Sequence, residues 1–359
     1  MLKVKPQILK ILPYTPGKSK AEGFDKVIKL SSNENPLGAS PKAIEAYKNF
    51  DAFNRYPDAT SAALREAIGK AHELDEAKLM CGSGSDEILG LIAHGFLSEG
   101  DEAIYTKHGF LVYPIAILAS GATPVVVEEK NYTTDVDAIL AAVTAKTRVV
   151  FVANPNNPTG THISNAEMLR LRKGLREDIL LVIDSAYAEC ATAADYKDGR
   201  EIVDIGANTI MPRTFSKIYG LAALRLGWAY AHPSIIDILN RIRPVFNINL
   251  PAQMAGIAAL EDKDFFKRSL EHNVKWRDIL TQKVRGMGYE VLPSQTNFIT
   301  VKFGGEADSG TKAFNFLKSK GILTREIGGY SLPKFLRISF GTDAENELLL
   351  KYLQEYKNQ

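Results

Sequence analysis

Short apolar runs alternate with amphipathic stretches between about residues 40 and 250 of this 359-residue chain. The apolar runs are rich in β-branched residues, as in RVVFVA at 148–153 and ILLVID at 179–184, and helical periodicity follows them. Strands that alternate with helices form a mostly parallel sheet with helices packed on its faces. We therefore predict an α/β fold with a mostly parallel central sheet flanked by helices.

The pattern changes in the last hundred residues. A long helical stretch leads into a strand, a helix at TKAFNFLKSKG (311–321), a strand at FLRISF (335–340) and a last helix. This order is typical of a smaller α+β domain. We predict an N-terminal arm or small-domain segment over 1–38, a large domain over 39–255 and a small C-terminal α+β domain over 256–359.

Charge and cysteine content exclude several classes of protein. Lys and Arg total 44 against 42 Asp and Glu, so the chain lacks the broad basic surface that nucleic-acid binding requires. No apolar run is long enough to span a bilayer, and Lys and Pro interrupt the apolar stretches at the start, unlike a signal peptide. Cys81 and Cys190 form no CxxC pair, which argues against a disulfide framework or a metal site. We expect a cytoplasmic protein with small-molecule partners, without metal, nucleic acid or membrane.

One lysine stands among hydroxyl residues in TFSKIYGLAALRLG, residues 214–227. A partly buried lysine near another cation has a lowered pKa, and the neutral amine can form a Schiff base. Arg225 could be that cation and could also grip a phosphate, to which Thr214 and Ser216 add hydroxyl donors. This predicts Schiff-base chemistry at Lys217; the alternative is a surface loop with an ordinary lysine.

Polar residues follow two of the predicted buried strands. NPNNPTG at 154–160 comes directly after RVVFVA, at the strand end where ligands bind in open α/β sheets, although Asn, Pro and Gly also favour a plain turn. Asp184 ends the next strand, where a buried carboxylate needs a positive partner. A protonated pyridine nitrogen is one such partner, and a helix N-cap or a core ion pair is the alternative.

Two further stretches indicate anion or ring binding. CGSGSDEILGLIAHGFL at 81–97 places small residues before an amphipathic helix, with Ser83 or Ser85 as N-cap, so free amides could bind an anion. Any capped helix looks similar, and Asp86 could serve only the helix dipole. His108 follows the strand AIYTK and could stack on a flat ring or be an ordinary loop residue.

Two arginines near the end of the chain indicate an anionic substrate. Arg337 lies inside the strand FLRISF between Leu336 and Ile338, where burial is costly without an anion. A substrate carboxylate or phosphate could supply that charge. Arg325, on the preceding strand, could add a second charge or could be a solvated edge residue.

Seven motifs occur in the order seen in fold-type I aminotransferases, which this chain resembles over nearly its whole length. They are SSNENPLG, FNRYPD, GSGSDE, NPNNPTG, DSAY, TFSKIYGLAALRLG and LRISFGT. Within that superfamily the PYTPGK arm, NENPLG, the lysine motif and LRISFGT resemble the histidinol-phosphate aminotransferase family. The resemblance implies a fold-type I transferase dependent on pyridoxal 5'-phosphate.

The resemblance also implies roles for individual residues. Lys217 would form the Schiff base and shuttle a proton between the substrate α-carbon and C4' of the cofactor. Asp184 would keep the pyridine nitrogen protonated, Asn157 and Tyr187 would bind the phenolic oxygen, and His108 would stack over the ring. The implied phosphate cup is Ser85, Asp86, Thr214, Ser216 and Arg225, with Tyr56 reaching in from a second subunit of a homodimer. Arg337 would bind the substrate anion, with Arg325 and Tyr14 enclosing it.

The implied reaction is transamination between histidinol phosphate and 2-oxoglutarate, giving imidazole acetol phosphate and glutamate, and running in reverse in histidine biosynthesis. Ser185 and His108 depart from the residues common in the family at these positions, Glu and an aromatic residue. The alternatives are an aromatic amino-acid or broad-specificity aminotransferase, a lyase resembling threonine-phosphate decarboxylase, and a non-catalytic cofactor-binding regulator.

Overall fold

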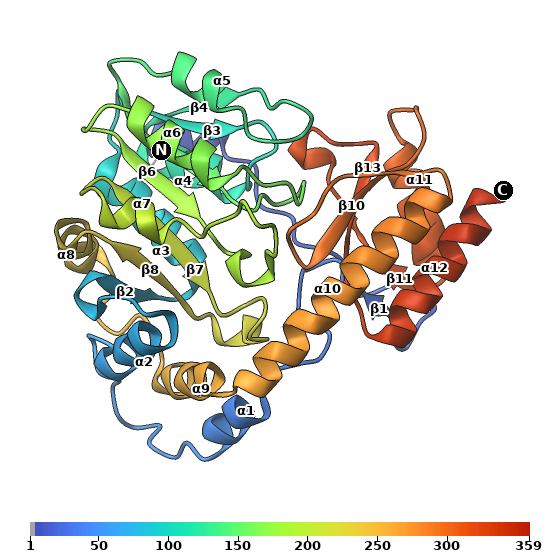
Figure 1. Ribbon diagram of the computed structural model, residues 1–359, viewed down its shortest axis with the longest axis horizontal. Helices are drawn as coiled ribbons and strands as arrows, with labels where there is room; N and C mark the ends of the chain where they lie inside the picture. Colours follow the sequence, from blue (N-terminus) through green and yellow to red (C-terminus); the bar gives the residue numbers. More distant parts are fainter. Residues whose placement is uncertain (1–3) are drawn as a thin grey trace.

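A seven-stranded sheet forms the larger part of the computed structural model, which describes residues 4–359 (Figure 1). Its strand order is β2-β8-β7-β6-β5-β3-β4. The strands from β3 to β7 pair in parallel, whereas β8 runs antiparallel to β7 and β2. The predicted mostly parallel sheet is therefore confirmed. The strands are β2 Leu79–Gly82, β3 Glu102–Thr106, β4 Thr123–Val127, β5 Thr147–Ala153, β6 Leu180–Asp184, β7 Thr209–Thr214 and β8 Gly227–Ala231.

Helices cover both faces of this sheet because its central strands are apolar on both sides. On β5, Val149 and Phe151 pack into the core under α3, α4 and α8, whereas Val150 and Val152 pack under α5 and α6. This alternation follows from the two-residue period of an extended strand. The helices are α1 Pro41–Lys48, α2 Ala62–His72, α3 Gly84–Phe96, α4 Val112–Ser120, α5 Val136–Ala141, α6 Asn165–Gly174, α7 Arg200–Asp204, α8 Pro233–Ile242 and α9 Leu250–Glu261.

A four-stranded antiparallel sheet of order β12-β13-β10-β9 forms the C-terminal part, with a separate apolar core beneath its helices. Its strands are β9 Glu290–Val291, β10 Phe298–Lys302, β12 Arg325–Glu326 and β13 Phe335–Ser339, and its helices are α10 Lys263–Gly286, α11 Ser309–Ser319 and α12 Asp343–Lys357. The predicted helix at 311–321 and strand at 335–340 correspond to α11 and β13. The domain boundaries stay a prediction, and α9 runs across the one at 255.

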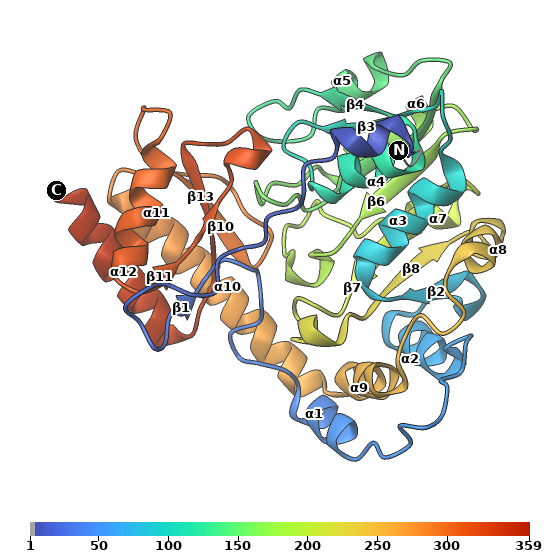
Figure 2. The ribbon, with the colours of Figure 1, turned by 180° about the vertical axis from the view of Figure 1, so that it is seen from behind.

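The N-terminal segment lies along both parts of the molecule (Figure 2). Strand β1, Ile28–Lys29, pairs in parallel with β11, Ile322–Leu323, and the 3-10 helix η1, Pro6–Lys10, packs against α4. Residues 11–27, between η1 and β1, therefore pass the edge where the large sheet and the C-terminal part of the molecule meet (Figure 2). The other 3-10 helices are η2 Glu76–Lys78, η3 Ala188–Cys190, η4 Ala222–Leu224 and η5 Gly328–Tyr330.

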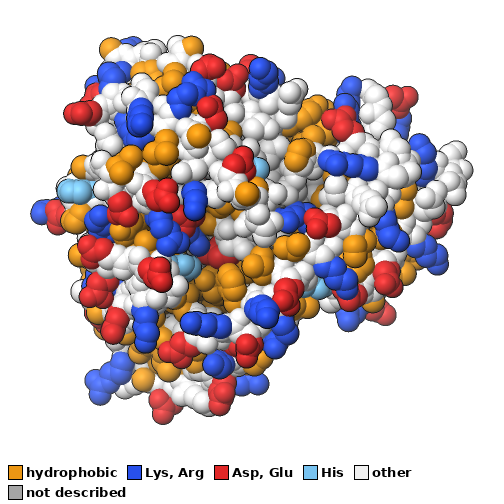
Figure 3. All heavy atoms as spheres, in the orientation of Figure 1, with side chains coloured by type: hydrophobic (Ala, Val, Ile, Leu, Met, Phe, Trp, Pro, Cys, Tyr) orange, Lys and Arg blue, Asp and Glu red, His pale blue; other side chains and the backbone are white. Residues whose placement is uncertain are grey.

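The surface carries charges of both signs. Figure 3 shows Lys and Arg side chains interspersed with Asp and Glu over one face, in keeping with the formal charge of +2. Within residues 4–359, no helix combines the length and the apolar character needed to cross a membrane. Cys81 and Cys190 are buried free thiols.

A buried ion cluster ties the end of β7 to the loops after β6. The Arg213 guanidinium donates to Glu189 at 2.7 Å and to Asp198 at 2.8 Å, and it lies 5.1 Å from the ring centre of Trp228. Arg213 and Glu189 are almost completely buried. Because charges desolvated in this way depend on each other, the cluster fixes the loops on either side of it.

Replacement of Glu189 by Ala should cost about 3 kcal/mol or more in the free energy of unfolding, because it removes one partner of a buried charge pair. The matched control is Asp237→Ala, which breaks the exposed pair between Asp237 and Arg241 and should leave the free energy of unfolding almost unchanged. Urea unfolding followed by circular dichroism measures both variants. Equal losses would contradict a structural role for the buried cluster.

Candidate active site

A cavity of about 270 Å³ opens at the carboxyl ends of β5, β6 and β7, between this edge and the C-terminal sheet. All predicted site residues line it except His108 and Tyr56. The lining members of that set are Tyr14, Ser85, Asp86, Asn157, Asp184, Tyr187, Thr214, Ser216, Lys217, Arg225, Arg325 and Arg337. Parallel strands bring their carboxyl ends to one edge, which is why segments distant in sequence meet here.

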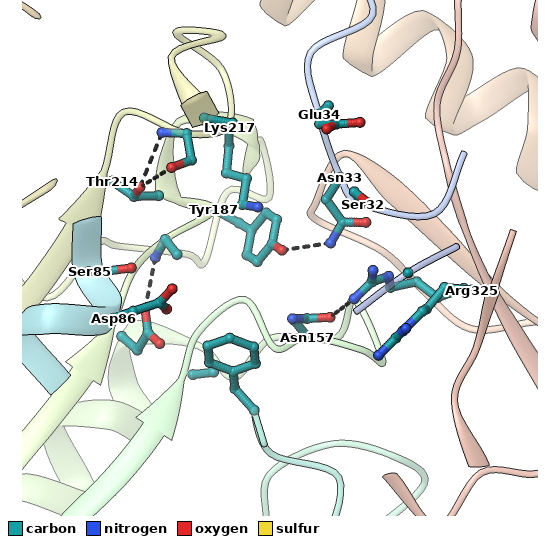
Figure 4. A pocket seen from close by; sticks show the side chains of 18 of the residues that line it. Ser32, Asn33, Glu34, Ser85, Asp86, Asn157, Tyr187, Thr214, Lys217 and Arg325 are labelled. Atoms are coloured by element: carbon teal, nitrogen blue, oxygen red, sulfur yellow. Dashed lines mark hydrogen bonds between the residues drawn. The ribbon is translucent and has the colours of Figure 1, made fainter. Parts of the chain in front are cut away.

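Lys217 lies in the turn that follows β7, where the Gly220 amide donates to the Lys217 carbonyl at 3.0 Å. Its side chain faces the cavity, and the amine lies 5.7 Å from the ring centre of Tyr187 (Figure 4). Burial, together with the positive charge of Arg337, lowers the pKa of Lys217 to about 8. An appreciable minority of this amine is therefore neutral near physiological pH, far more than for an ordinary lysine, and can act as a nucleophile or base.

Asp184 is a buried carboxylate at the end of β6. It accepts hydrogen bonds from the Tyr113 hydroxyl at 2.7 Å and from the Ala186 amide at 3.3 Å. Among the described residues, no Lys, Arg or His lies within ion-pair distance of it. Burial raises the pKa of Asp184 to about 6. A cationic group placed against this carboxylate would remove that cost.

An anion-binding cup lies beside the lysine. It combines the start of α3 with the Arg225 guanidinium, which is 3.1 Å from Asp86, and the hydroxyl of Thr214, which donates to Ser216 at 2.9 Å. Gly84 allows this approach, because a Cβ there would lie 2.7 Å from the Arg225 guanidinium. Helix amides, hydroxyls and a guanidinium are the donor set that binds phosphate.

Two arginines face the opposite end of the cavity. Arg325 and Arg337 are directly opposed partners of β12 and β13, and both line the cavity. Arg337 donates to Asn157 at 2.5 Å and to the Ser31 carbonyl at 2.8 Å, but its buried Nε has no hydrogen-bond partner among residues 4–359. No carboxylate within residues 4–359 pairs with Arg337. Because like charges opposed on a sheet repel each other, this end of the cavity favours an anion.

Two predicted residues lie outside the cavity. His108 turns toward η5, where its Nδ1 is 2.6 Å from the Tyr330 carbonyl, and Phe110, two residues later, lines the cavity instead. His108, which the resemblance implied as the stacking residue, therefore lies outside the cavity because its ring is held at the Tyr330 carbonyl, while Phe110 offers an aromatic ring in the cavity wall. The stacking role itself stays a prediction. Tyr56 is exposed and stacks on Phe246 at 4.4 Å between ring centres.

Sequence reasoning missed the residues that the N-terminal segment contributes. Ser31, Ser32, Asn33 and Glu34 line the cavity wall opposite Lys217 (Figure 4). The motif SSNENPLG marked this segment only through its resemblance to other proteins. No periodicity or strand end in the segment itself indicated that it reaches the site.

The residues present fit pyridoxal 5'-phosphate. A nucleophilic amine, a buried carboxylate without a cationic partner and a phosphate-type donor set surround one cavity. These are the groups needed to hold an aldehyde, a protonated ring nitrogen and a phosphate. The apolar ring of Phe110 in the same wall offers a surface for a flat ring.

The comparisons with known proteins agree with this geometry. Residues 25–353 match the model of the family "Aminotransferase class I and II". The chain is 50% identical to a histidinol-phosphate aminotransferase of Rhodopseudomonas palustris (strain TIE-1) over 99% of this chain and 98% of that protein, and 49% identical to one of Rhodospirillum centenum over 95% of each. The crystal structure of the Sinorhizobium meliloti histidinol-phosphate aminotransferase in complex with pyridoxal-5'-phosphate superposes with a TM-score of 0.91 at 28% identity, covering 100% of this chain and 98% of that one. The chain therefore belongs to the class I and II aminotransferases and, within them, to the histidinol-phosphate aminotransferase family.

Proposed function

We propose that this protein uses pyridoxal 5'-phosphate to exchange an amino group between L-histidinol phosphate and 2-oxoglutarate, giving imidazole acetol phosphate and glutamate, and that it runs in reverse in histidine biosynthesis. The substrate class is inferred from the opposed pair Arg325 and Arg337, which lines the same cavity as Lys217, and from the lack of an acidic partner for Arg337 among the described residues. Such a pair requires a strongly anionic substrate.

One arginine site serves both substrates. Glutamate and 2-oxoglutarate present a second carboxylate, whereas histidinol phosphate lacks any carboxylate and presents a phosphate. A guanidinium fork matches the oxygen spacing of both anions. Arg337 would bind the anion, and Arg325 and Tyr14, whose ring centre lies 5.8 Å from the Arg325 guanidinium, would close over it.

The cofactor, when bound, supplies an electron sink for the charge that develops at the substrate α-carbon. Lys217 would hold it covalently, with its phosphate in the cup of Ser85, Asp86, Thr214, Ser216 and Arg225. Asp184 would keep a proton on the ring nitrogen, since this carboxylate has no other cationic partner in the described chain. Asn157 and Tyr187 would bind the phenolic oxygen, and Phe110 would pack on the ring.

Lys217 Nζ would also move the proton that transamination requires. Its lowered pKa leaves the amine neutral in part, so Nζ can accept the proton of the substrate α-carbon and later return it. The enclosing walls limit competition from water at this atom.

We propose in addition that the enzyme is a cytoplasmic homodimer in which Tyr56 completes the phosphate cup of the other subunit. The exposed stack of Tyr56 on Phe246 supports a subunit contact at this loop, since large aromatic rings are enriched in interfaces. Buried free thiols suit a reducing compartment.

Cofactor uptake by the apoprotein should become faster as pH rises through about 8, because only the neutral Lys217 amine attacks the aldehyde and its pKa lies below the ordinary 10.5. Stopped-flow absorbance at several pH values measures the rate. Lys217→Ala should show no covalent uptake and no turnover. A midpoint near 10.5 would mean that burial does not activate this amine.

Replacement of Arg337 by Leu should lower kcat/KM for glutamate and for histidinol phosphate by about 100-fold or more, because a charge-assisted pair to each anion is lost. Arg337→Lys, which keeps the charge and loses the fork, should fall between Leu and wild type. Steady-state kinetics with both substrates tests this. A loss confined to one substrate would rule out the shared anion site.

The substrate itself is tested by adding L-histidinol phosphate or L-phenylalanine to the yellow holoenzyme. Histidinol phosphate should remove the visible absorbance quickly at concentrations where phenylalanine has little effect, because phenylalanine carries no second anion for Arg337. Comparable rates would favour a broad or aromatic aminotransferase. A purified protein that takes up no colour from added cofactor would refute the whole proposal.

A further inference from the structure

Asn33 occupies a constrained position between the two parts of the molecule. It is buried and lies in the left-handed region with φ of 55°, where Asn is tolerated better than most residues. Its side chain reaches Tyr187, and its backbone contacts Ser339 and Asn297. A residue in this strained conformation persists only where its contacts offset the strain.

The hydrogen bonds around Asn33 have only one consistent direction. The Asn33 backbone N–H donates to the Ser339 hydroxyl at 2.8 Å, and within residues 4–359 Asn33 Oδ1, also at 2.8 Å, is the one acceptor that this buried hydroxyl reaches for its own proton. This places Oδ1 toward Ser339 and Nδ2 toward Tyr187. Nδ2 then donates to the Tyr187 hydroxyl oxygen at 2.7 Å (Figure 4).

The Tyr187 hydroxyl therefore receives one hydrogen bond and must direct its own proton elsewhere. Tyr187 is buried and lines the cavity beside Lys217. In pyridoxal 5'-phosphate the phenolic oxygen is ortho to the aldehyde group that the lysine attacks, so the Tyr187 hydroxyl and the Lys217 amine would face neighbouring substituents of one bound ring.

We propose that Asn33 is a positioning residue that fixes the Tyr187 hydroxyl as a donor to the phenolic oxygen of the bound cofactor. This inference rests on the proposed function. A donor at that oxygen stabilises its negative charge most when the neighbouring nitrogen, which joins Lys217 to the cofactor, carries no proton. Asn33 thus lowers the pKa of that nitrogen without touching the cofactor.

The hydrogen bonds that run from Ser339 through Asn33 to Tyr187 begin on β13, the strand that also carries Arg337. Ser339 lies two residues after Arg337 on β13, so one strand positions both the anion-binding group and the orientation of Tyr187. The other charged or titratable groups near Lys217 are Arg337, Asp86, Arg225, Cys190 and Asp184. None of them changes in Asn33→Gly, which also adds no charge, so a spectral shift in that variant reports on the hydroxyl.

The test is a pH titration of the visible absorbance of the holoenzyme. Asn33→Gly keeps the left-handed backbone and removes the amide, and Asn33→Asp replaces the donor by an acceptor that draws the Tyr187 proton away from the cavity. Both should raise the pKa of the spectral transition by about one pH unit, the equivalent of one hydrogen bond. In a Tyr187→Phe background, Asn33→Gly should cause no further shift, because Asn33 acts only through the hydroxyl.

Asn297→Ala is the matched control, since it removes the hydrogen bond to the Asn33 carbonyl and leaves the side-chain amide in place. It should lower the melting temperature and leave the spectral pKa unchanged. Unshifted Asn33 variants, or an equal shift in the Tyr187→Phe background, would overturn this inference alone while the wild-type protein takes up colour. A colourless wild-type protein would overturn it together with the proposed function.

Discussion

The parallel pairing of β5, β6 and β7 is the constraint on which the rest of the site depends. Ala153 is the register partner of Asp184, and the Ser185 amide donates to the carbonyl of Pro212, so the three strands end close together. The NPNNPTG turn, Asp184 and Lys217 leave the same edge of the sheet for this reason. The buried pair of Arg213 and Glu189 then fixes the loops that leave the sheet, so the cavity has rigid walls before any ligand enters.

Buried charges are paired in the framework beneath the cavity, whereas those around the cavity are unpaired within the described residues. Beneath the cavity, Arg213 is matched by carboxylates, whereas around the cavity Lys217, Asp184 and Arg337 lie desolvated without a partner of opposite charge at ion-pair distance in the described residues. Each of these three groups is destabilised by burial. The cofactor and the substrate anion carry the complementary charges, and their binding would repay the cost and thereby stabilise the fold.

Much of this arrangement could be predicted from the sequence, because polar residues directly after apolar strands identify an edge. Asp184 and the NPNNPTG turn were identified in this way, and Lys217 by its position among hydroxyl residues before Arg225. The aromatic residue in the cavity wall was not predicted, since the placement of His108 and Phe110 depends on the turn after β3 and on the Tyr330 carbonyl, which is distant in sequence. Asn33 also escaped prediction, because its partners become apparent only in three dimensions. The role of Tyr56 was implied by the resemblance alone and requires a second subunit, so it stays a prediction.

The N-terminal segment has a consequence for the order of events in folding. Asn33 and Ser339, which hydrogen-bond to each other, are separated by 306 residues. Contacts of such high sequence separation require closure of a long loop, which is entropically unfavourable and slow. During synthesis the segment leaves the ribosome first, yet β13 must appear before Asn33 can dock. The cavity is therefore completed only after β13 has been synthesised. Nascent chains that end before Ser339 lack the contact between Asn33 and Ser339 and hence an intact site.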